Sequence, residues 1–326
     1  MDAEPPERAE VLASLRRPDA QRPEVDAALC EEIRSTLERS VFEFLPLMVP
    51  LRATKDTVRR VLRCDSHLVA HLGQGAGQPS AAMVKGAMAD RLFAQTIAGF
   101  PIGDDVVSDA LRGAAVAGDE SLADHWNALD TSDQDEVRSA LTEIGTELAA
   151  RWPSLPSAAL PRLQSTLRVE LCGGQVILTG RVDLTLGQVL RGRSSTVLLD
   201  VKTGTPRIDD RADADWYALL ETLRAGCQPF QSGNYYVSTG FLDIRPVTLE
   251  DMQRTTSRVA DALNRLGRLA SGAAPNRSPG PLCPWCPAYA TCEEGQQHIR
   301  GSESATNQWL QDFDDEWHEE STADDI

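Results

Sequence analysis

Two carboxylates and one lysine form the chemically most suggestive set in this sequence. Asp200 and Lys202 are two residues apart in the apolar run 196–204, and side chains two apart on a β-strand point to the same face. Asp183 closes the preceding Gly-Arg-Val-Asp at 180–183. Carboxylates hold hard divalent cations such as Mg²⁺, and an ammonium neutralises negative charge that develops in a transition state. The set suits metal-assisted phosphodiester hydrolysis, with a structural ion pair at a sheet edge as the alternative.

The scarcity of lysine strengthens the chemical interpretation. Lys55, Lys85 and Lys202 are the only lysines in a chain that carries 32 basic residues in total. Because lysine is so rare here, each one suggests a specific role, and the position of Lys202 beside Asp200 fits a role in catalysis.

Four of the seven cysteines form a second candidate site. Cys283, Cys286 and Cys292 are spaced C-x2-C-x5-C, and Cys64 ends an expected helix far upstream. Three such thiolates bind one soft metal centre but need a fourth ligand, which Cys64 would supply. A disulfide framework is not expected, because the N-terminus lacks the apolar core of an export signal and cytoplasmic thiols stay reduced.

The other metal-binding residue types are less suggestive. His67 and His71 are four residues apart near Cys64 and form a weak zinc-pair candidate. The remaining thiols have no nearby companions and are interpreted as core or incidental residues; they are Cys30, Cys172 and Cys227.

The hydrophobic pattern predicts the elements that position these residues. Apolar residues recur at helical spacing through most of residues 24–150, with Thr54 as an expected N-cap. From about Leu167 the period changes to two around a Gly-Gly turn, which predicts a hairpin, and the strand at 196–204 follows. A helix over 213–224, further strand and a long helix from Thr248 complete the order. We expect an α/β (α+β) fold, in which helices flank a mixed central sheet.

Charge and composition divide the chain into three parts. We expect a partly helical extension over 1–50, the main domain over 51–298 and an acidic tail over 299–326. The tail contributes heavily to the net charge of −17, which argues against a nucleic-acid coat protein. Its aromatic residues Trp309, Phe313 and Trp317 recur every four residues, as in an amphipathic docking helix or, alternatively, by chance in a disordered end. No apolar run is long enough to cross a membrane, and a cytoplasmic location is expected.

The sequences GRVDLTL and LLDVKTG resemble the core of the PD-(D/E)XK nuclease superfamily, in particular its RecB-type branch. The resemblance implies a restriction-endonuclease-like core that cleaves DNA with Mg²⁺ or Mn²⁺. It also implies that Asp183, Asp200 and the Val201 carbonyl bind the metal and that Lys202 is the catalytic lysine.

Two family positions depart from the pattern. Asp90 stands where RecB-type domains carry a metal-binding histidine, so the resemblance makes Asp90 a candidate ligand. The family also has a Gln-x-x-x-Tyr element on the helix after the lysine strand. Gln231 and Tyr235 match its letters, but Asp213 and Tyr217 match its position. We favour position and name Tyr217 as the catalytic candidate.

The cysteine arrangement resembles iron–sulfur nucleases of the same branch, including the AddB subunit and CRISPR-adaptation exonucleases. The resemblance implies that a [4Fe–4S] cluster binds Cys64, Cys283, Cys286 and Cys292, with zinc or free thiols as alternatives. A cluster there would clamp the two ends of the nuclease domain together.

The resulting functional hypothesis is a metal-dependent DNA nuclease acting on single strands or ends in repair, recombination or defence against foreign DNA. A catalytically impaired DNA- or partner-binding subunit is the alternative. The chain has no G-x4-GK[ST] motif, so unwinding would require a helicase partner. Four arginines of the last helix share one face and are candidate phosphate contacts; they are Arg254, Arg258, Arg265 and Arg268.

Overall fold

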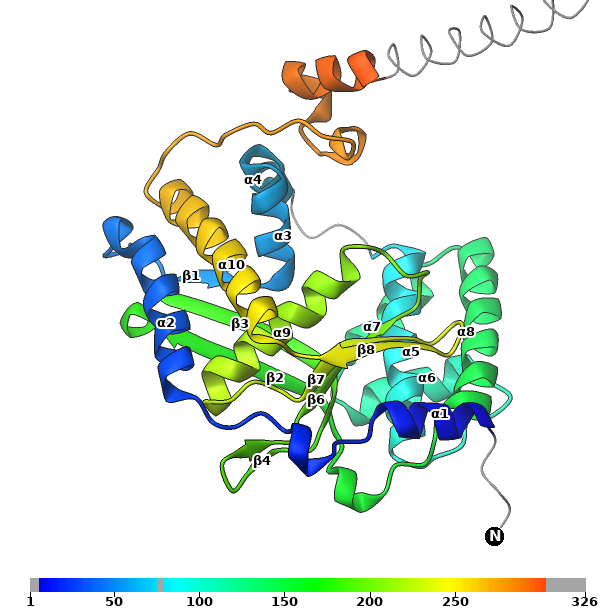
Figure 1. Cartoon of the computed structure of the whole chain (residues 1–326). Coiled ribbons are helices and arrows are strands. Elements are labelled where there is room, and N and C mark those ends of the chain that lie inside the picture. The colour runs from blue at the N-terminus through cyan, green and yellow to red at the C-terminus, as the bar shows by residue number, and fades with distance from the viewer. Residues whose placement is uncertain (1–5, 75–78, 303–326) are drawn as a thin grey trace, which may run out of the picture.

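A mixed β-sheet lies at the centre of the computed structural model, which describes residues 6–74 and 79–302 (Figure 1). The sheet strands are β1 (Leu51–Ala53), β2 (Arg162–Leu171), β3 (Val176–Leu186), β6 (Val197–Lys202), β7 (Gln231–Tyr236) and β8 (Phe241–Pro246). Their order is β1-β3-β6-β7-β8, with β2 on the other edge of β3. A small separate hairpin consists of β4 (Val189–Leu190) and β5 (Arg193–Ser194). The expected mixed sheet is thereby confirmed.

Strand β3 organises the sheet because it is long enough to pair with three other strands. Strand β2 runs antiparallel along nearly all of one edge. The opposite edge is shared: β1 pairs in parallel with residues 176–178, and β6 pairs antiparallel with residues 184–186. Between these two contacts β3 has no paired neighbour on that edge. The sheet splits there, next to Asp183.

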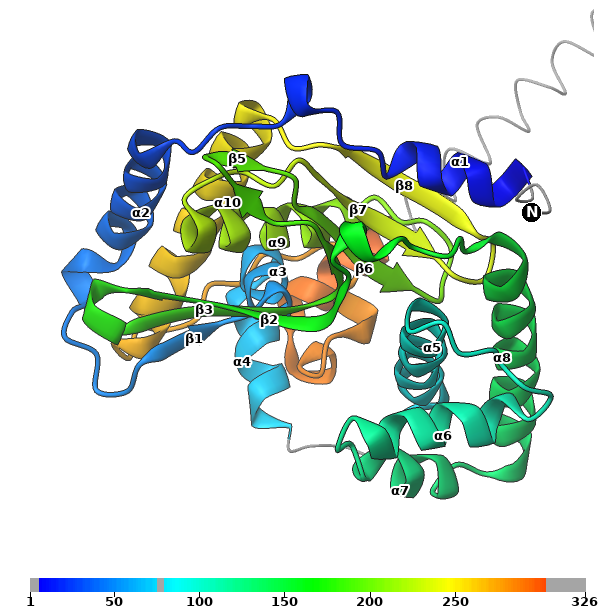
Figure 2. The same ribbon diagram turned by 90° about the horizontal axis from the view of Figure 1, so that it is seen from below.

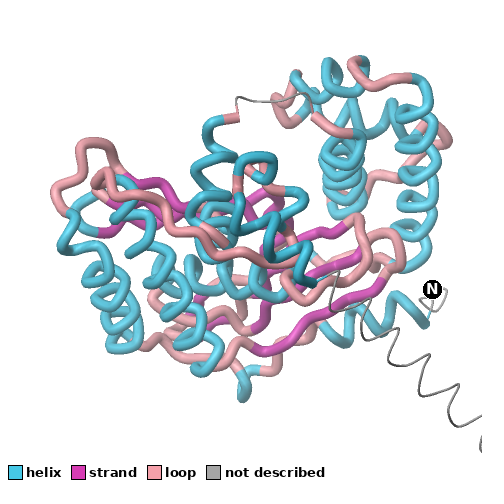
Figure 3. The backbone as a smooth tube through the Cα atoms, turned by 90° about the horizontal axis from the view of Figure 1, so that it is seen from above, coloured by secondary structure: helices cyan, strands magenta, loops and turns pink. Residues whose placement is uncertain are grey.

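Helices cover both faces of the sheet (Figures 1 and 2). One layer contains α2 (Ala27–Val41), α3 (Lys55–Arg63), α4 (Asp65–Gly73), α9 (Asp210–Ala225) and α10 (Leu249–Ala270). The other contains α1 (Pro6–Ser14), α5 (Ala81–Ile97), α6 (Val106–Val116), α7 (Ser121–Asn127) and α8 (Thr131–Arg151). The tube in Figure 3 shows the strands enclosed between these helical groups.

Each helical layer buries its own apolar cluster against the sheet. Strand β6 serves both, since Leu198 belongs to the cluster under α2, α9 and α10 while its neighbour Leu199 belongs to the cluster under α5 and α8. This alternation follows from the two-residue period of a strand. The N-terminal segment takes part as well: Leu15 lies in one cluster and Leu37 in the other.

Local signals explain where several helices begin. Thr54 caps α3 by accepting a hydrogen bond from the Thr57 amide at 3.2 Å, as its position in the sequence predicts. Thr248 and Asp251 form a capping box at the start of α10, where the sequence predicts a helix to begin. Asp130 caps α8 (Thr131–Arg151) by accepting a hydrogen bond from the Asp133 amide at 2.8 Å.

The tail aromatics Trp309, Phe313 and Trp317 lie outside the described residues. Among the helices that the structure describes, none combines the length and apolar character that a membrane span requires.

Candidate functional site

Asp200 and Lys202 lie on the same face of β6, at the end where the sheet splits. The Lys202 ammonium lies 2.6 Å from the Asp200 carboxylate, and Asp200 is only 4% exposed. Burial acts to raise the pKa of Asp200, but the charges of Lys55 and Lys202 outweigh it and hold that pKa below its ordinary value. Burial likewise acts to lower the pKa of Lys202, and Asp200 reverses the effect. The pair is therefore ionised.

Asp183 on β3 lies beside this pair and is held by two hydrogen bonds. Its Oδ2 accepts from the Val201 amide at 2.7 Å, and its Oδ1 accepts from the Gln164 side-chain amide at 3.0 Å. Burial and the neighbouring charge of Asp200 raise the pKa of Asp183 to about 7. Two carboxylates with different proton affinities thus lie at the split in the sheet.

Lys55 is a fourth member of the site, one that motif comparison did not identify. It is the first residue of α3, and its ammonium lies 3.3 Å from both Asp200 oxygens and 3.4 Å from Asp213. It also lies 5.0 Å from the centre of the Tyr217 ring. The available signal was the rarity of lysine together with the cap at Thr54, which starts the helix at this residue.

Helix α9 contributes Asp213 and Tyr217, which are four residues apart and so share one helix face. Asp213 accepts a hydrogen bond from Lys202 at 2.7 Å. Tyr217 is 3% exposed, and its pKa is raised by burial, by nearby carboxylates and by its hydrogen bond to Asp200. Tyr235, in contrast, packs in an aromatic cluster against Phe93 and Trp152.

Asp90 approaches the site from α5 on the other side of the sheet. Burial raises the pKa of Asp90 well above its ordinary value, and the charges of Asp183 and Asp200 raise it further. Asp213 adds a fourth carboxylate, which pairs with Lys55 and Lys202, while Arg91 and Arg181 act on Asp90. Buried carboxylates that raise one another's pKa suit a divalent cation, because the cation offsets their repulsion.

The donor set fits a metal that keeps much of its water. Across residues 6–74 and 79–302, no three His, Cys, Asp or Glu side chains lie close enough together to ligate one ion. Mg²⁺ commonly uses only one or two carboxylates and retains several waters. Asp183 and Asp200 meet that requirement, and Asp90 lies close enough to interact with both through charge.

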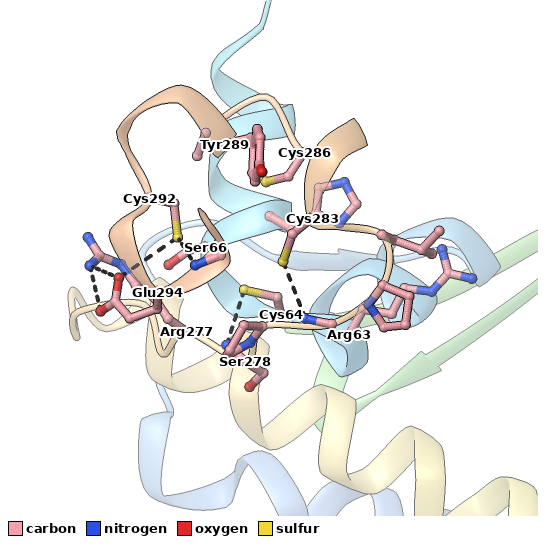
Figure 4. Close-up of a pocket in the computed structure, with 17 residues that line it drawn as sticks. Arg63, Cys64, Ser66, Arg277, Ser278, Cys283, Cys286, Tyr289, Cys292 and Glu294 are labelled. Atoms are coloured by element: carbon pink, nitrogen blue, oxygen red, sulfur yellow. Dashed lines mark hydrogen bonds and ion pairs between the residues drawn. The ribbon is translucent and has the colours of Figure 1, made fainter. Parts of the chain in front are cut away.

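The four predicted cluster cysteines line one cavity of about 380 Å³ at the end of α3 and α4 (Figure 4). Three of their sulfur atoms accept backbone hydrogen bonds. Cys64 accepts from Ser278 at 3.5 Å, Cys283 from Gly280 at 3.3 Å and Cys292 from Gly295 at 3.4 Å. Such donors suit sulfur atoms that carry negative charge. A Cβ on Gly295 would lie 3.4 Å from the sulfurs of both Cys283 and Cys292.

Asp65, next to Cys64, anchors the cavity to the rest of the protein. It is fully buried and accepts hydrogen bonds from the Arg268 side chain and, at 3.1 Å, from the Asn276 amide. The three elements joined are α4, α10 and the segment that leads to Cys283. His67 also lines the cavity.

Most of the arginine face of α10 is already engaged. Arg254 pairs with Asp251, Arg265 with Asp261 and Arg268 with Asp65. Arg258 is the exception within the described residues, since it is exposed and makes no side-chain hydrogen bond or ion pair there.

Comparison with known proteins connects this geometry to a family. The model of the PD-(D/E)XK nuclease superfamily matches residues 57–293, more than two thirds of the chain. No curated protein matches closely enough to count as a relative.

Two solved structures show distant similarity. One, from Eubacterium rectale and described as a "Putative exonuclease", is 12% identical over 75% of this chain and 86% of its own, with a TM-score of 0.43. The other, described as SSO0001, is 10% identical over 81% of this chain and 97% of its own, with a TM-score of 0.33. The match to the superfamily model over residues 57–293 spans every strand of the sheet except β1. On the basis of this match, the chain belongs to the PD-(D/E)XK nuclease superfamily.

Proposed function

We propose that this protein is a divalent-metal-dependent deoxyribonuclease of the RecB-type branch, acting on single-stranded DNA or DNA ends. The observation that carries the proposal is the meeting of Asp183, Asp200 and Lys202 at the split in the sheet. Family membership supports a nuclease, and the mutual repulsion of the buried carboxylates Asp90, Asp183 and Asp200 supports a requirement for Mg²⁺ or Mn²⁺. Exonuclease action in repair, recombination or defence against foreign DNA fits this chemistry.

Each residue has a distinct role in this proposal. Asp183, Asp200 and the Val201 carbonyl would hold the ion, with Asp90 acting on its water shell. The bound ion would polarise the phosphate and lower the pKa of the attacking water. Lys202 would orient that water and neutralise charge on the phosphate. Tyr217 fixes the Asp200 carboxylate through its hydroxyl.

Degradation of labelled linear and circular DNA by anaerobically purified protein tests the proposal. We expect cleavage with Mg²⁺ or Mn²⁺ and at least a roughly 100-fold loss in Lys202→Ala, as for loss of a transition-state donor. Lys85→Ala is the matched control, because Lys85 makes no side-chain hydrogen bond or ion pair within the described residues. Equal degradation by wild type and Lys202→Ala, or none with any metal, would reject the nuclease activity.

The presence of an aspartate at position 90 supports a second candidate function, that of a DNA- or partner-binding subunit with impaired catalysis. An aspartate stands there where RecB-type domains have a histidine, and its raised pKa shows that ionisation at this position is costly. Under this alternative the chain binds DNA, or a helicase or nuclease partner, but cleaves nothing. Asp90→His then restores cleavage, whereas the active enzyme needs no such change.

We also propose a [4Fe–4S] cluster on Cys64, Cys283, Cys286 and Cys292, with zinc as the alternative. The four thiols line one cavity, and backbone amides donate to the sulfurs of Cys64, Cys283 and Cys292, which supports thiolate ligands for a metal centre there. Anaerobic purification should give brown protein with bound iron and sulfide. Cys286→Ser should lose both, while Cys30→Ser should keep them. Zinc in place of iron would overturn the cluster assignment.

A further inference from the structure

A groove of about 260 Å³ opens beside the catalytic carboxylates, between α3, α9 and α10. Lys55 and Asp213 line its inner end, so the groove begins where the proposed chemistry takes place. Its walls also include apolar side chains from all three helices; they are Val58, Leu62, Trp216 and Val259. The groove is therefore partly apolar and continuous with the site.

Helix α3 presents a row of cations to this groove. Lys55, Arg59 and Arg63 all line it, and their spacing of four residues places them along one helix face. At a rise of 1.5 Å per residue, the row extends about 12 Å from the catalytic carboxylates. Its far end reaches the cysteine-lined cavity, because Arg63 lines both spaces. Arg258 faces the groove from α10.

These cations can exchange their present partners for an anionic ligand. Arg59 pairs with Asp56 and Arg63 with Asp209, and the four side chains are 34–51% exposed. Such exposed pairs contribute little to stability, because solvent screens them. Arg258 has no side-chain partner in the part of the chain that the structure describes. A phosphate would therefore gain contacts at little cost.

The carboxylates of the groove do not cancel this attraction, because three of them line it against four basic side chains. Asp209 pairs with Arg63, Asp213 with both lysines of the site and Asp215 with Arg211. Only Arg258 contributes a charge without a counterpart.

We infer that this groove holds a single strand of nucleic acid, with successive phosphates on the α3 row and Arg258. The inference rests on the proposed nuclease function and defines the path of its substrate. A cavity of this volume between three helices holds a nucleotide of one strand with its base against the apolar wall, and it leaves no room for a second strand. The strand leads away from Asp200 towards the cysteine-lined cavity.

Binding of fluorescent oligonucleotides to the full-length holoprotein, with chelator present to prevent cleavage, tests this path. Arg258→Gln should bind a single strand several-fold more weakly. It should also reduce the slope of log affinity against log salt by about 0.7, the value for one phosphate contact on a single strand. Arg258→Lys should recover most of the affinity. Arg16→Gln, which changes an exposed arginine just after α1, outside the residues that line the groove, is the control and should bind like wild type.

A scan with uncharged methylphosphonate linkages locates the contact. In the wild type, neutralising the phosphate that faces Arg258 should weaken binding; in Arg258→Gln the same linkage should have no effect. Unchanged binding by Arg258→Gln, or equal losses at every linkage in both proteins, would overturn the path. A blunt duplex that binds as tightly as the single strand would do so too.

The binding assay separates this inference from the proposed activity. If no metal supports cleavage but the coupling between Arg258 and one phosphate persists, the nuclease function fails and the strand path stands. If cleavage depends on Lys202 but Arg258 shows no coupling, the enzyme assignment stands and the path is wrong.

Discussion

The Oδ2 atom of Asp183 accepts a 2.7 Å hydrogen bond from the backbone amide of Val201. Strands β3 and β6 make their last ladder pair at Leu184 and Leu199. One residue further along β3, the Asp183 side chain takes the place of a backbone acceptor and bridges the gap that opens between β3 and β6. This contact joins the two carboxylate-bearing strands and leaves Asp200 on the adjacent position of β6.

The raised pKa of Asp183 predicts that Asp183→Asn stabilises the metal-free protein. The folded state holds its proton up to about pH 7, whereas the unfolded chain releases it near the ordinary value of 3.8. Stability of the wild type therefore falls as pH rises between these values. We expect the variant to gain about 1–3 kcal/mol above pH 7, the usual cost of a poorly satisfied buried polar group.

Thermal unfolding in chelator from pH 4 to pH 8 measures this effect. The difference in Tm between variant and wild type should grow towards pH 7 and then level off. A difference that is constant across the range would contradict the assignment of the raised pKa. Added Mn²⁺ should stabilise only the wild type.

Gln164 adopts a left-handed backbone conformation, with φ of 49°, at the position where it donates to Asp183. Non-glycine residues rarely adopt this region, and such strain is frequently found at functional sites. Because this hydrogen bond lowers the pKa of Asp183, Gln164→Gly should raise that pKa above 7 while relieving the backbone. Carbon-detected NMR titration of the Asp183 carboxyl should show the shift.

Gln188→Gly, a matched change at an exposed position near the end of β3, should leave the Asp183 titration unchanged. A titration in Gln164→Gly that matches the wild type would show that Gln164 does not act on the carboxylate.

Tyr217→Phe should reduce the cleavage rate about 10-fold. The hydroxyl bonds to Asp200, and a hydrogen bond to a charged group contributes about 1.5–3 kcal/mol. Tyr235→Phe is the matched control, because the Tyr235 hydroxyl is buried without a hydrogen-bond partner in the described structure. Steady-state rates with Mg²⁺ distinguish the two; greater loss in Tyr235→Phe would favour the literal Gln231–Tyr235 match.

Asp65→Ala should destabilise the protein by about 3 kcal/mol, because it leaves the Arg268 side chain and the Asn276 amide without their buried acceptor. Asp261→Ala removes an ion pair of α10 whose aspartate is 52% exposed and should cost less than about 1 kcal/mol. Urea unfolding measures both. Equal costs would show that Asp65 does not anchor the C-terminal segment.

Local patterns were sufficient to predict most elements of the fold. The change of period near Leu167 predicted the β2–β3 hairpin, and the caps at Thr54 and Thr248 predicted two helix starts. These signals are visible in sequence because each depends on residues within a few positions of one another. The α9 face that carries Asp213 and Tyr217 follows from the same short-range periodicity.

The composition of the site depends on contacts that are distant in sequence. Lys55 meets Asp200 across 145 residues and Gln164 meets Asp183 across a strand pair, so no spacing rule connects them. The arginine face of α10 shows the same limit. Helical periodicity placed its four arginines on one side, but it could not reveal that three of them already pair with aspartates.

The sequence by itself identified the candidate site residues: Asp183, Asp200 and Lys202 on strands, and the four cysteines at their spacing. Tertiary structure alone decided which side chains surround them. Because β1 and β6 share one edge of β3, the sheet opens at Asp183, and the start of α3 brings Lys55 into that opening. The charge balance of the site, and the groove that leads from it, arise from this packing of separate segments.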